Sequence, residues 1–531
     1  MAKYIFVTGG VVSGLGKGVS AASLGRLLKS RGYSIFVQKF DPYLNVDPGT
    51  MSPYEHGEVY VTKDGGETDL DLGHYERFIG TSFTKNSNFT SGQIYSKILE
   101  NERNGRYEGK TVQIIPHITK HIENLIISAG KKSEADFVIT EIGGTVGDIE
   151  SQPFIYALAT FANKHKNDSY FIHATYVPYL EASKEFKSKP TQHSVKEIRQ
   201  YGINPNMVLL RANKTPTQEI IEKTAFAAQI EEKSVIGVPN SDNIYKVPLF
   251  LEEKKMAHQV LKYFGMKNKT PKLDDWEKFV SLIDKKKSKE ITIGMIGKYI
   301  KFEDAYMSII EALKISSIYS NVSLKMKWID ATSISSSNVK SKLSNIDGAL
   351  VLPGFGKRGF NGKVEATTFL RNTKIPTLGI CYGLQAMTVS QAIESGYKDA
   401  TSREISTGGT PIIDIMKNKS SIGKLGGTLR LGENETIITK GTLAYKIYGE
   451  TSIFERHRHR YEVNPKYKNE LENNGFVFSG HSGKDGLAEI VEYKKHPFYI
   501  GVQYHPEFNS NPLTDHKLFS AFVNKIKSSK K

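Results

Sequence analysis

The sequence predicts two α/β domains, each built on a doubly wound, mostly parallel sheet. An apolar strand, a glycine-rich turn, an amphipathic helix and a second strand follow one another over residues 4–41, and a similar alternation restarts at residue 291. Strands that alternate with helices pair in parallel, because each crossover returns the chain to the same end of the sheet. The length of 531 residues also exceeds what one hydrophobic core supports.

The elements of the first domain are expected within residues 1–266. Its predicted strands are the apolar runs 4–10, 34–41, 135–144, 169–178 and 206–213, and its first helix is predicted over 20–32. Residues 267–290 are polar and rich in lysine, which indicates a linker with one short helix. The second domain is expected over 291–531, with strands at 291–300, 322–330, 346–356 and 375–381 and a helix at 304–318.

Composition excludes several classes of protein. A single cysteine rules out a disulfide scaffold and any metal centre built on several thiolates. No apolar run reaches the length of a membrane span and no signal-peptide core follows the first residues, so we expect a cytoplasmic protein. The net charge of +16 attracts anions such as nucleotides, although a lysine-rich proteome is the simpler explanation. The basic residues are scattered and no nucleic-acid-binding signature is present, so the sequence does not favour nucleic acid as a binding partner.

The turn TGGVVSGLGKGVS at residues 8–20 lies between a predicted strand and a predicted helix. Small residues let backbone N–H groups surround an anion, and the helix N-terminus adds partial positive charge. Lys17 supplies a cation for a phosphate. The spacing departs from GxxxxGK[ST], and Gly18 stands where that motif has a magnesium-binding hydroxyl. We interpret the turn as a variant phosphate loop whose magnesium ligands lie elsewhere; the alternative is a plain glycine turn.

Carboxylates for magnesium are predicted at two places. Asp69 and Asp71 have strand-like spacing, which would put them on one face. Glu141 ends an apolar strand, the usual position of a functional residue in an open α/β sheet. Because magnesium bridging two phosphates needs only one or two carboxylates, Asp71 and Glu141 would suffice. A carboxylate at a strand end is more often a surface group, so this prediction depends on the phosphate loop.

Cys381 lies between Gly379 and Gly383, after a predicted strand and before a predicted helix. This is the nucleophile-elbow arrangement, in which small neighbours allow a sharp turn. A thiolate nucleophile needs a base and a group that orients the base. His505 and Glu507 would lie on one face of an extended segment. The glycine turn 352–356 would supply an N–H for an oxyanion.

Motifs along essentially the whole chain resemble those of the CTP synthase family. They are TGGVVSGLGKG, the highly specific segment 39–78, VQIIPHIT, EIGGTVGDIES, KPTQHSVKE, GICYGLQ, ERHRHRYEVN and QYHPEF. The resemblance implies a phosphate-loop NTPase-like synthetase domain followed by a flavodoxin-like class I glutamine amidotransferase domain. It implies that ATP phosphorylates O4 of UTP and that ammonia released from glutamine displaces the phosphate to give CTP. Also implied are Mg²⁺, GTP as an allosteric activator, CTP as a feedback inhibitor and a homotetramer.

The resemblance also implies roles for individual positions. Cys381, His505 and Glu507 would hydrolyse glutamine, Lys17 and Lys39 would neutralise phosphoryl charge, and Asp71 and Glu141 would bind magnesium. ATP would be held by Ser13, Gly14, Leu15, Gly16, Lys17, Gly18, Val19, Asp71, Asn240 and Ser241. UTP or CTP would contact Ser13, Asp148, Ile149, Glu150, Lys187, Ser188, Lys189, Pro190, Thr191, Gln192 and Lys223. Glutamine would contact Gly354, Tyr382, Gly383, Leu384, Gln385, Glu404 and Arg460.

Two departures and two alternatives accompany this interpretation. Pro353 stands where the family usually has glycine, and proline has no N–H, so Gly354 must supply the oxyanion donor. Tyr382 replaces an expected smaller aliphatic residue and would reshape the glutamine pocket. One alternative is another phosphate-loop amidotransferase, such as a cofactor side-chain amidase, against which segment 39–78 argues. The other is a non-catalytic scaffold that forms filaments or binds RNA, against which the intact candidate catalytic residues argue.

Overall fold

The computed structural model describes residues 2–415 and 429–530, which form two compact units. The first unit comprises Met1–Pro48 and Asp71–Val280, and the second comprises Gly49–Leu70 and Ser281–Lys531. Segment 49–70 therefore groups with the C-terminal half, although the sequence places it among the N-terminal motifs. The domain limits 1–266, 267–290 and 291–531 remain a prediction, and their outermost residues, Met1 and Lys531, lie outside the described part.

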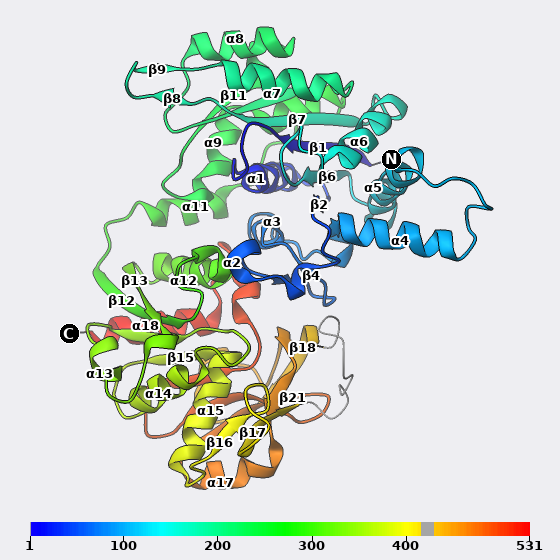
Figure 1. Ribbon diagram of the computed structural model, residues 1–531. Helices are drawn as coiled ribbons and strands as arrows, with labels where there is room; N and C mark the ends of the chain where they lie inside the picture. Colours follow the sequence, from blue (N-terminus) through cyan, green and yellow to red (C-terminus); the bar gives the residue numbers. More distant parts are fainter. Residues whose placement is uncertain (1, 416–428, 531) are drawn as a thin grey trace. The chain divides into compact units, whose positions relative to one another are not determined.

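The first unit contains a seven-stranded sheet in which every neighbouring pair is parallel, in the order β11-β10-β7-β1-β6-β2-β5 (Figure 1). This confirms the predicted parallel α/β class. Its strands are β1 (Lys3–Gly9), β2 (Ile35–Asp41), β5 (Asn88–Thr90), β6 (Phe137–Ile142), β7 (Ser169–Tyr176), β10 (Met207–Ala212) and β11 (Val235–Pro239), with a small hairpin of β8 (Tyr179–Leu180) and β9 (Glu185–Phe186). Its helices are α1 (Lys17–Lys29), α3 (Asp71–Ile79), α4 (Ser91–Arg103), α5 (Thr119–Ser133), α6 (Gln152–Lys164), α7 (Lys189–Gln200), α8 (Gln218–Ala228), α9 (Val247–Glu253), α10 (Met256–Tyr263) and α11 (Asp274–Ile283).

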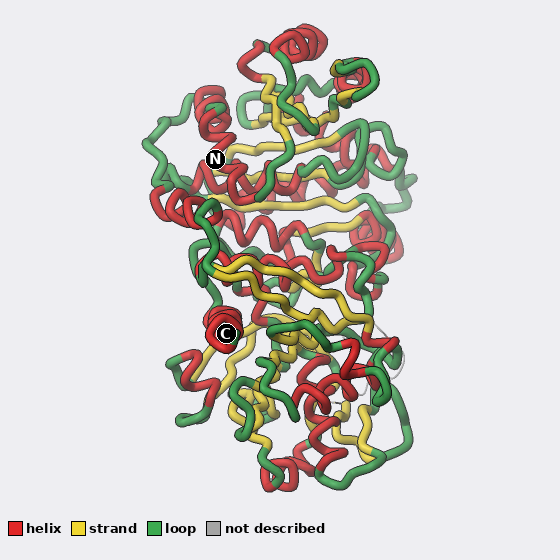
Figure 2. The backbone as a smooth tube through the Cα atoms, turned by 90° about the vertical axis from the view of Figure 1, so that its left-hand side faces the viewer, coloured by secondary structure: helices red, strands yellow, loops and turns green. Residues whose placement is uncertain are grey.

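Helices cover both faces of this sheet (Figure 2). Val138 packs with α5 and α6 in one apolar cluster, whereas its neighbour Ile139 faces α1, where a Cβ on Gly25 would lie 3.6 Å from Ile139 Cδ1. Successive strand residues point to opposite faces, so both must be apolar when both faces are covered. That explains the nearly continuous apolar runs from which the strands are predicted.

Helix α11 confirms the short helix predicted between the domains, but it does not belong to an exposed tether. Trp276 is fully buried, and its Nε1 donates a hydrogen bond of 2.8 Å to the carbonyl of Tyr245. The guanidinium of Arg26 lies 5.1 Å from the Trp276 ring centroid. The N-terminal part of the lysine-rich segment is therefore packed against the first unit.

The second unit contains a nine-stranded sheet of order β13-β12-β14-β15-β23-β22-β21-β18-β19. Its strands are β12 (Lys289–Gly297), β13 (Val322–Asp330), β14 (Gly348–Val351), β15 (Thr377–Ile380), β18 (Arg430–Ile438), β19 (Ser452–His459), β21 (Phe476–Ser482), β22 (Ala488–Tyr493) and β23 (Tyr499–Val502). Further strands are β3 (Tyr60–Val61), β4 (Glu67–Thr68), β16 (Ala400–Ser402), β17 (Thr410–Ile415) and β20 (Tyr461–Val463). Its helices are α2 (Pro53–His56), α12 (Met307–Tyr319), α13 (Val339–Lys342), α14 (Phe360–Arg371), α15 (Tyr382–Glu394), α16 (Leu443–Tyr448), α17 (Lys468–Asn473) and α18 (Lys517–Ser529).

Only part of this second sheet is parallel. The strands from β13 to β23 pair in parallel, whereas β23-β22, β22-β21, β21-β18 and β18-β19 are antiparallel. The antiparallel part arises where short connections replace helical crossovers, as in the turn after Ser482 that joins β21 to β22. The predicted strands all belong to the parallel part, because strand–helix alternation, from which they are predicted, is typical of parallel pairing.

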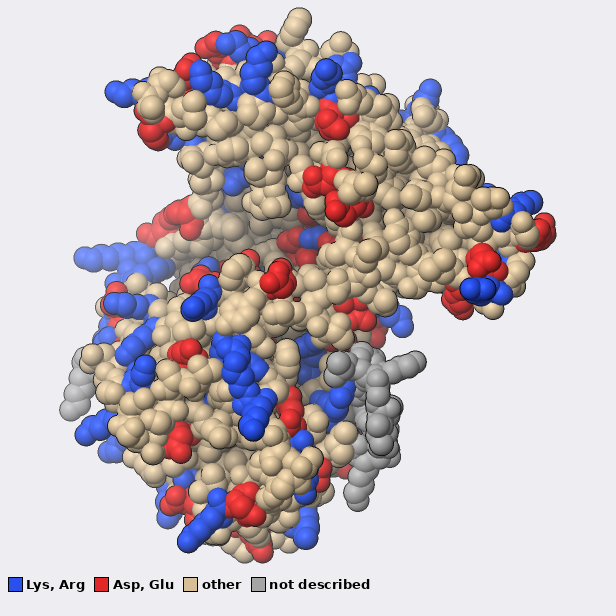
Figure 3. Space-filling view, viewed as in Figure 1, with Lys and Arg blue, Asp and Glu red and all other residues tan. Residues whose placement is uncertain are grey.

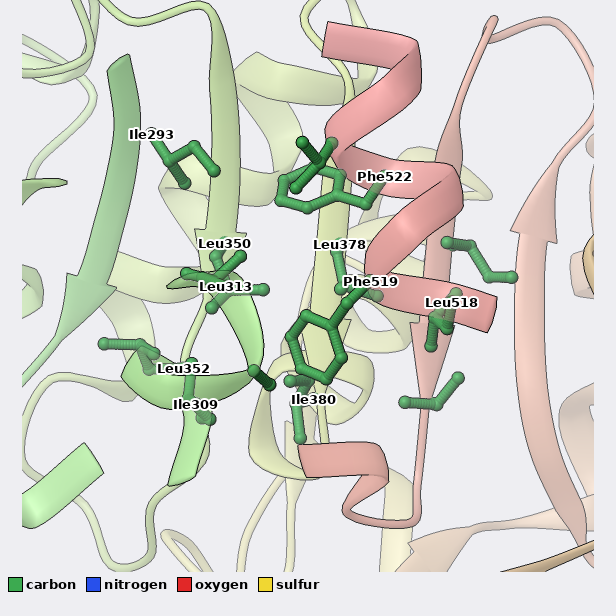
Figure 4. Close-up of a cluster of buried hydrophobic side chains, with 14 of the residues drawn as sticks. Ile293, Ile309, Leu313, Leu350, Leu352, Leu378, Ile380, Leu518, Phe519 and Phe522 are labelled. Atoms are coloured by element: carbon green, nitrogen blue, oxygen red, sulfur yellow. The ribbon is translucent and has the colours of Figure 1, made fainter. Parts of the chain in front are cut away.

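Apolar packing in the second unit fixes the ends of two central strands. Leu350 and Leu352 at the end of β14, and Leu378 and Ile380 of β15, pack against α12 and α18 in a fully buried cluster (Figure 4). The alternate residues Ala349 and Val351 pack on the other face with α14 and α15. Since Leu352 precedes the glycine turn and Ile380 precedes Cys381, this core holds both segments in place.

No helix in residues 2–415 or 429–530 has the length and apolar character that crossing a bilayer requires. Figure 3 shows Lys and Arg mixed with Asp and Glu on the visible face of each unit. The net positive charge is thus distributed over that face, as the scattered basic residues of the sequence predict.

Candidate active sites

The predicted phosphate loop joins β1 to α1 at the carboxyl end of the first sheet. Helix α1 starts at Lys17, three residues earlier than predicted, because Gly16 adopts a left-handed conformation with φ of 76° directly before it. Gly14 and Val11 also have positive φ, of 71° and 79°. A β-branched residue in this region is strained, and such strain is typical of functional turns.

A cavity of about 330 Å³ lies beside this loop. It brings together most of the predicted ATP, phosphoryl and magnesium residues. Its lining consists of Ser13, Gly14, Leu15, Gly16, Lys17, Gly18, Val19, Lys39, Asp41, Asp71, His74, Glu141, Gly143 and Gly144. The turn is therefore not a plain glycine turn between strand and helix, because it forms one wall of a cavity that also contains cationic and carboxylate side chains.

The charged groups of this cavity are strongly coupled. Burial would raise the pKa of Asp71, but the ammonium of Lys39, which forms an ion pair with it, holds that pKa below the ordinary value. Burial raises the pKa of Glu141 to about 7, and the hydroxyl of Tyr75 donates a hydrogen bond to this carboxylate. Burial lowers the pKa of Lys17, whose Nζ donates to the Gly144 carbonyl at 2.7 Å. The cavity thus contains cations and two nearby carboxyl groups for a phosphate–metal ligand.

Asp69 and Asp71 do not share the face of a strand, so that prediction is wrong. Strand β4 ends at Thr68, and Asp71 is the first residue of helix α3 in the first unit. Asp69 lies in the second unit, where its carboxylate is 3.4 Å from Nε2 of His56. A carboxylate at the first position of a helix is stabilised by the helix dipole. The residues after Asp71, LGHYERFI, have helical periodicity, and together these features explain why Asp71 begins a helix and does not continue a strand.

Arg211 is a site residue that the motifs did not reveal. Its Nε donates to the Leu15 carbonyl in the phosphate loop at 3.0 Å, and its Nη2 donates to Oδ1 of Asn240 at 3.1 Å. Arg211 therefore ties the loop to the segment predicted to lie near adenine, although Asn240 and Ser241 do not line the 330 Å³ cavity. Its position near the end of strand β10 is the signal that could have identified it.

A buried hydrogen-bond chain links the phosphate loop to α7. Nδ1 of His173 is 3.0 Å from Oγ1 of Thr8, and its Nε2 is 2.7 Å from Oγ of Ser194. Burial, assisted by Lys17, lowers the pKa of His173 to about 3, so the imidazole is neutral. A Cβ on Gly10 would lie 1.8 Å from Ser194 Oγ, which explains the glycine there.

The residues predicted for the pyrimidine nucleotide lie outside the 330 Å³ cavity, apart from Ser13. Lys187 and Ser188 precede α7, whose first turn contains Lys189, Pro190, Thr191 and Gln192. Thr191 is buried and donates to the Tyr176 carbonyl at 2.9 Å. Lys223 pairs with Glu219 on α8, and Asp148, Ile149 and Glu150 form the turn before α6. The structure thus places these residues on several loops and helices of the first unit without showing one enclosed site.

In the second unit, Cys381 occupies a strained elbow between β15 and α15, with φ of 52°. A Cβ on Gly383 would lie 2.3 Å from the Val351 carbonyl, and one on Gly379 would lie 2.8 Å from Sδ of Met387. Only glycine fits at these two positions, which confirms the physical reason for the predicted elbow.

We expect Gly383→Ala to destabilise the second unit by about 1–3 kcal/mol, the usual effect of overpacking a rigid core. The added methyl group must displace the backbone of β14 at Val351. Thermal unfolding of the full chain measures the effect. Gly408→Ala is the matched control, since the nearest atom to its Cβ would be 3.9 Å away. Equal melting temperatures for the two variants would contradict this account of the elbow.

The predicted base and orienting group lie beside Cys381. Nδ1 of His505 is 2.7 Å from Oε1 of Glu507, although the backbone is a 3-10 turn, Pro506–Asn509, rather than the extended strand that was predicted. Burial would lower the pKa of His505, but the Glu507 carboxylate and then the Cys381 sulfur raise it to about 10. Nε2 of Gln503 lies 3.6 Å from the sulfur. The imidazole is therefore held as a proton donor next to the nucleophile.

A cavity of about 370 Å³ opens on one side of Cys381. It contains most of the residues predicted for glutamine, and its lining includes Gly354, Tyr382, Gln385, Glu404 and Arg460. Oε1 of Gln385 is buried and has no hydrogen-bond partner among the described residues. Gly383 and Leu384 do not line this cavity; they are buried in the first turn of α15.

Comparison with known proteins agrees with this geometry. The family profile described as "CTP synthase N-terminus" matches residues 3–266, and "Glutamine amidotransferase class-I" matches residues 301–525. The CTP synthase of Mycoplasmopsis pulmonis is 54% identical over 526 residues, which cover 98% of each chain. The chain belongs to the CTP synthase family. The CTP synthases of Bacillus velezensis and Bacillus subtilis are 48% and 47% identical, again with 98% of each chain covered.

Membership of the CTP synthase family establishes the reaction. The chain is a ligase that aminates UTP to CTP with ammonia derived from glutamine, a step of pyrimidine nucleotide biosynthesis. The family uses ATP. Among solved structures, the glutaminase domain of Trypanosoma brucei CTPS with bound acivicin is 29% identical, covers 45% of this chain and 95% of its own, and has a TM-score of 0.43.

Proposed function

We propose that the first unit performs the phosphoryl and amination steps in the 330 Å³ cavity. ATP would lie against the loop from Ser13 to Val19, with Asn240 and Ser241 toward adenine. Lys17 and Lys39 would neutralise charge while O4 of UTP attacks the γ-phosphorus and ADP leaves. Ammonia would then attack C4 and expel the phosphate. Phosphoryl transfer depends mainly on positioning and charge neutralisation, which this group of residues can supply.

The carboxyl groups of Asp71 and Glu141 fit a magnesium ion. Asp71 raises the pKa of Glu141 electrostatically, in addition to burial, so the two carboxyl groups lie near each other inside the cavity. All their donor atoms are oxygens, which magnesium prefers, and one or two carboxylates are typical when phosphates supply the other ligands. Magnesium held there would supply charge neutralisation for the phosphates, and Lys39, which pairs with Asp71, would contact the nucleotide.

We propose that the second unit releases ammonia through a covalent intermediate on Cys381. With the thiol proton already held by His505, Sγ attacks the amide carbon of glutamine, and the oxyanion faces the backbone N–H groups of Gly354 and Tyr382. His505 then protonates the departing nitrogen, and water hydrolyses the thioester to glutamate. The N–H groups of Gly354 and Tyr382 have no hydrogen-bond partner among the described residues, which leaves them available. Arg460, Glu404 and Gln385 would hold the amino-acid end of glutamine.

The pH dependence of glutamine hydrolysis tests the role of Glu507. Because the pKa of His505 is raised to about 10, the imidazolium persists through pH 9, and the alkaline decline in kcat/KM begins only above that. Glu507→Gln removes the largest influence that raises this pKa, so the decline should move to lower pH. The measurement is kcat/KM for glutamate release between pH 6 and 10.5. An unchanged alkaline limb in the variant would contradict the assignment, and ammonia-supported CTP synthesis serves as the control.

We further propose the regulation, assembly and location that follow from kinship. UTP would contact Ser13, the segment Lys187–Gln192 and Lys223, and the product CTP would inhibit through Asp148–Glu150. GTP would activate glutamine hydrolysis, and the active form would be a cytoplasmic homotetramer. Sedimentation with and without ATP and UTP tests the assembly. Titration of CTP and GTP into a glutamine-supported assay tests the regulation.

One observation supports the whole proposal most strongly. Each unit by itself contains the reactive groups proposed for one half-reaction, with Lys17, Lys39, Asp71 and Glu141 in one and Cys381, His505 and Glu507 in the other. The decisive experiment follows CTP by absorbance with ATP, UTP and Mg²⁺, supplied with either glutamine or ammonium. A non-catalytic scaffold would give no CTP with either nitrogen source.

A further inference from the structure

The glycine turn beside Cys381 is held by buried side chains that no step above uses. Lys363, on helix α14, is fully buried. Its Nζ donates hydrogen bonds to the carbonyl of Leu352 and, at 3.3 Å, to the carbonyl of Pro353. A fully buried lysine is rare in folded proteins and is costly unless its charge is compensated.

The contact with Pro353 determines where the next N–H group points. In a trans peptide the carbonyl and the N–H of the same plane point in opposite directions. The Pro353–Gly354 bond is trans, since the only cis bond in the described chain is Ile115–Pro116. When Lys363 holds the Pro353 carbonyl, it therefore turns the Gly354 N–H away from itself. Gly354 lines the 370 Å³ cavity and also a smaller cavity of about 80 Å³ on which Cys381 and His505 lie.

The rest of the turn is fixed in the same manner. Lys298 donates to the Phe355 carbonyl, and the N–H of that same peptide, on Gly356, donates to Oε1 of Glu404 at 2.6 Å. The Gly356 carbonyl accepts a 2.6 Å hydrogen bond from the Tyr382 hydroxyl. The carbonyls of Pro353 and Phe355, on either side of Gly354, thus each accept a hydrogen bond from a lysine. The Gly354 N–H, in contrast, has no partner among the described residues.

The charge environment of Lys363 indicates that this side chain does not serve mainly to stabilise the fold. It forms no ion pair with any described carboxylate, and its hydrogen-bond partners are backbone carbonyls. Burial, together with the nearby Lys298, lowers the pKa of Lys363 to about 7. A well-packed apolar side chain would serve the core at lower cost, so the hydrogen bonds to the turn are what this lysine adds.

We propose that Lys363 is a positioning residue for glutamine hydrolysis: it holds the Pro353 carbonyl so that the Gly354 N–H faces the oxyanion formed at Cys381. The hydroxyl of Tyr382 and the ammonium of Lys298 hold the far side of the same turn. This inference rests on the proposed role of Cys381. It also assigns a purpose to Tyr382, the residue that departs from the family pattern at the elbow.

The test uses Lys363→Met in the full-length protein, which keeps the length of the side chain and removes its donors. We expect kcat for glutamate release to fall about 10- to 100-fold, somewhat less than the ~10²–10³-fold typical when an oxyanion donor itself is removed. KM for glutamine should change less than threefold. Ammonia-supported CTP synthesis should be unchanged, because the chemistry of the first unit does not involve this turn.

Two reagents that react with Cys381 distinguish a loss of the oriented Gly354 N–H from a general disruption of the site. L-glutamate γ-semialdehyde adds to the thiol: the S–C bond forms, the carbonyl π electrons move to oxygen, and that oxygen occupies the oxyanion position. Iodoacetamide alkylates sulfur by displacing iodide and develops no oxyanion. In Lys363→Met we expect the aldehyde to bind about 10- to 100-fold more weakly and alkylation of Cys381, the sole cysteine, to proceed at the parental rate.

Thr367→Val is the matched control. Thr367 is equally buried on α14, and its hydroxyl donates to the Val364 carbonyl at 2.9 Å, away from the turn. It should keep the parental kcat and aldehyde affinity. The proposal is overturned if Lys363→Met retains aldehyde affinity, if its alkylation slows as much as its turnover, or if Thr367→Val shows equal losses. A parental protein without cysteine-dependent glutaminase activity would instead refute the proposed function.

If Lys363→Met does not fold, Tyr382→Phe tests the same turn with a smaller change. It removes only the hydroxyl that holds the Gly356 carbonyl. We expect a loss of about 2- to 12-fold in both kcat and aldehyde affinity, the effect of about 0.5–1.5 kcal/mol for one hydrogen bond. Parental values for both quantities would overturn the proposed clamping of this turn.

Discussion

Cys381→Ala is expected to abolish CTP formation from glutamine and to leave CTP formation from ammonia near the parental rate. The sulfur atom is the only group at the elbow able to form the thioester, so its loss should reduce glutamate release by about 10⁴-fold or more. The substitution removes one small atom from a position directly after β15, and the cavity of the first unit is untouched.

The comparison of the two nitrogen sources makes this prediction specific. CTP is followed by its absorbance with saturating ATP, UTP and Mg²⁺, and ammonium replaces glutamine in the second arm. If ammonium fails to restore synthesis in Cys381→Ala, the proposed separation of ammonia release from ammonia use is wrong. If glutamine still supports synthesis, another residue is the nucleophile.

Lys17→Ala is expected to abolish CTP formation with either nitrogen source. Lys17 is buried at the start of α1 and lines the cavity with Lys39, Asp71 and Glu141. A cation that neutralises charge in phosphoryl transfer can contribute about 10³-fold or more to the rate. The measurement is ADP release dependent on UTP, together with CTP formation from ammonium.

Lys29→Ala is the matched control for this variant. Lys29 lies in the last turn of the same helix, where its Nζ donates to the Gly80 carbonyl at 2.9 Å and does not line the cavity. It should retain the parental rate of CTP formation. A near-parental rate for Lys17→Ala would remove this lysine from the phosphoryl step, and equal losses in both variants would indicate a general effect on α1.

Local patterns predicted the parallel framework and both reactive centres. The apolar runs before Gly9 and Cys381 are buried on both faces, and the glycines around Cys381 have no room for a side chain. These features depend on residues that are close together in the sequence, so periodicity and turn chemistry reveal them. The His505–Glu507 pair was also found this way, although its backbone is a turn rather than a strand.

Features that depend on distant residues were missed. Segment 49–70 belongs to the second unit, where Tyr60 donates to the Phe508 carbonyl and Glu67 pairs with Arg458. No local pattern indicates such contacts, which join residues about 400 positions apart. The same segment ends one residue before Asp71, where the chain returns to the first unit.

Buried polar groups outside motifs were missed for a related reason. Lys363, Arg211 and His173 each occur singly in segments whose composition suggests ordinary helix or strand. Their importance follows from the backbone groups that they contact, and those contacts exist only after folding. A lysine on an amphipathic helix is normally assigned to the solvent face, as the charge pattern alone would assign Lys363.

The most direct test of the central claim is CTP formation from UTP by the purified full-length protein with ATP, Mg²⁺ and concentrated ammonium. It isolates the first unit from glutamine chemistry and needs no assumption about the route of ammonia. The account predicts steady CTP formation, with one ADP released for each CTP, that Lys17→Ala abolishes and Cys381→Ala preserves. Absence of CTP from the parental protein under these conditions would contradict the account.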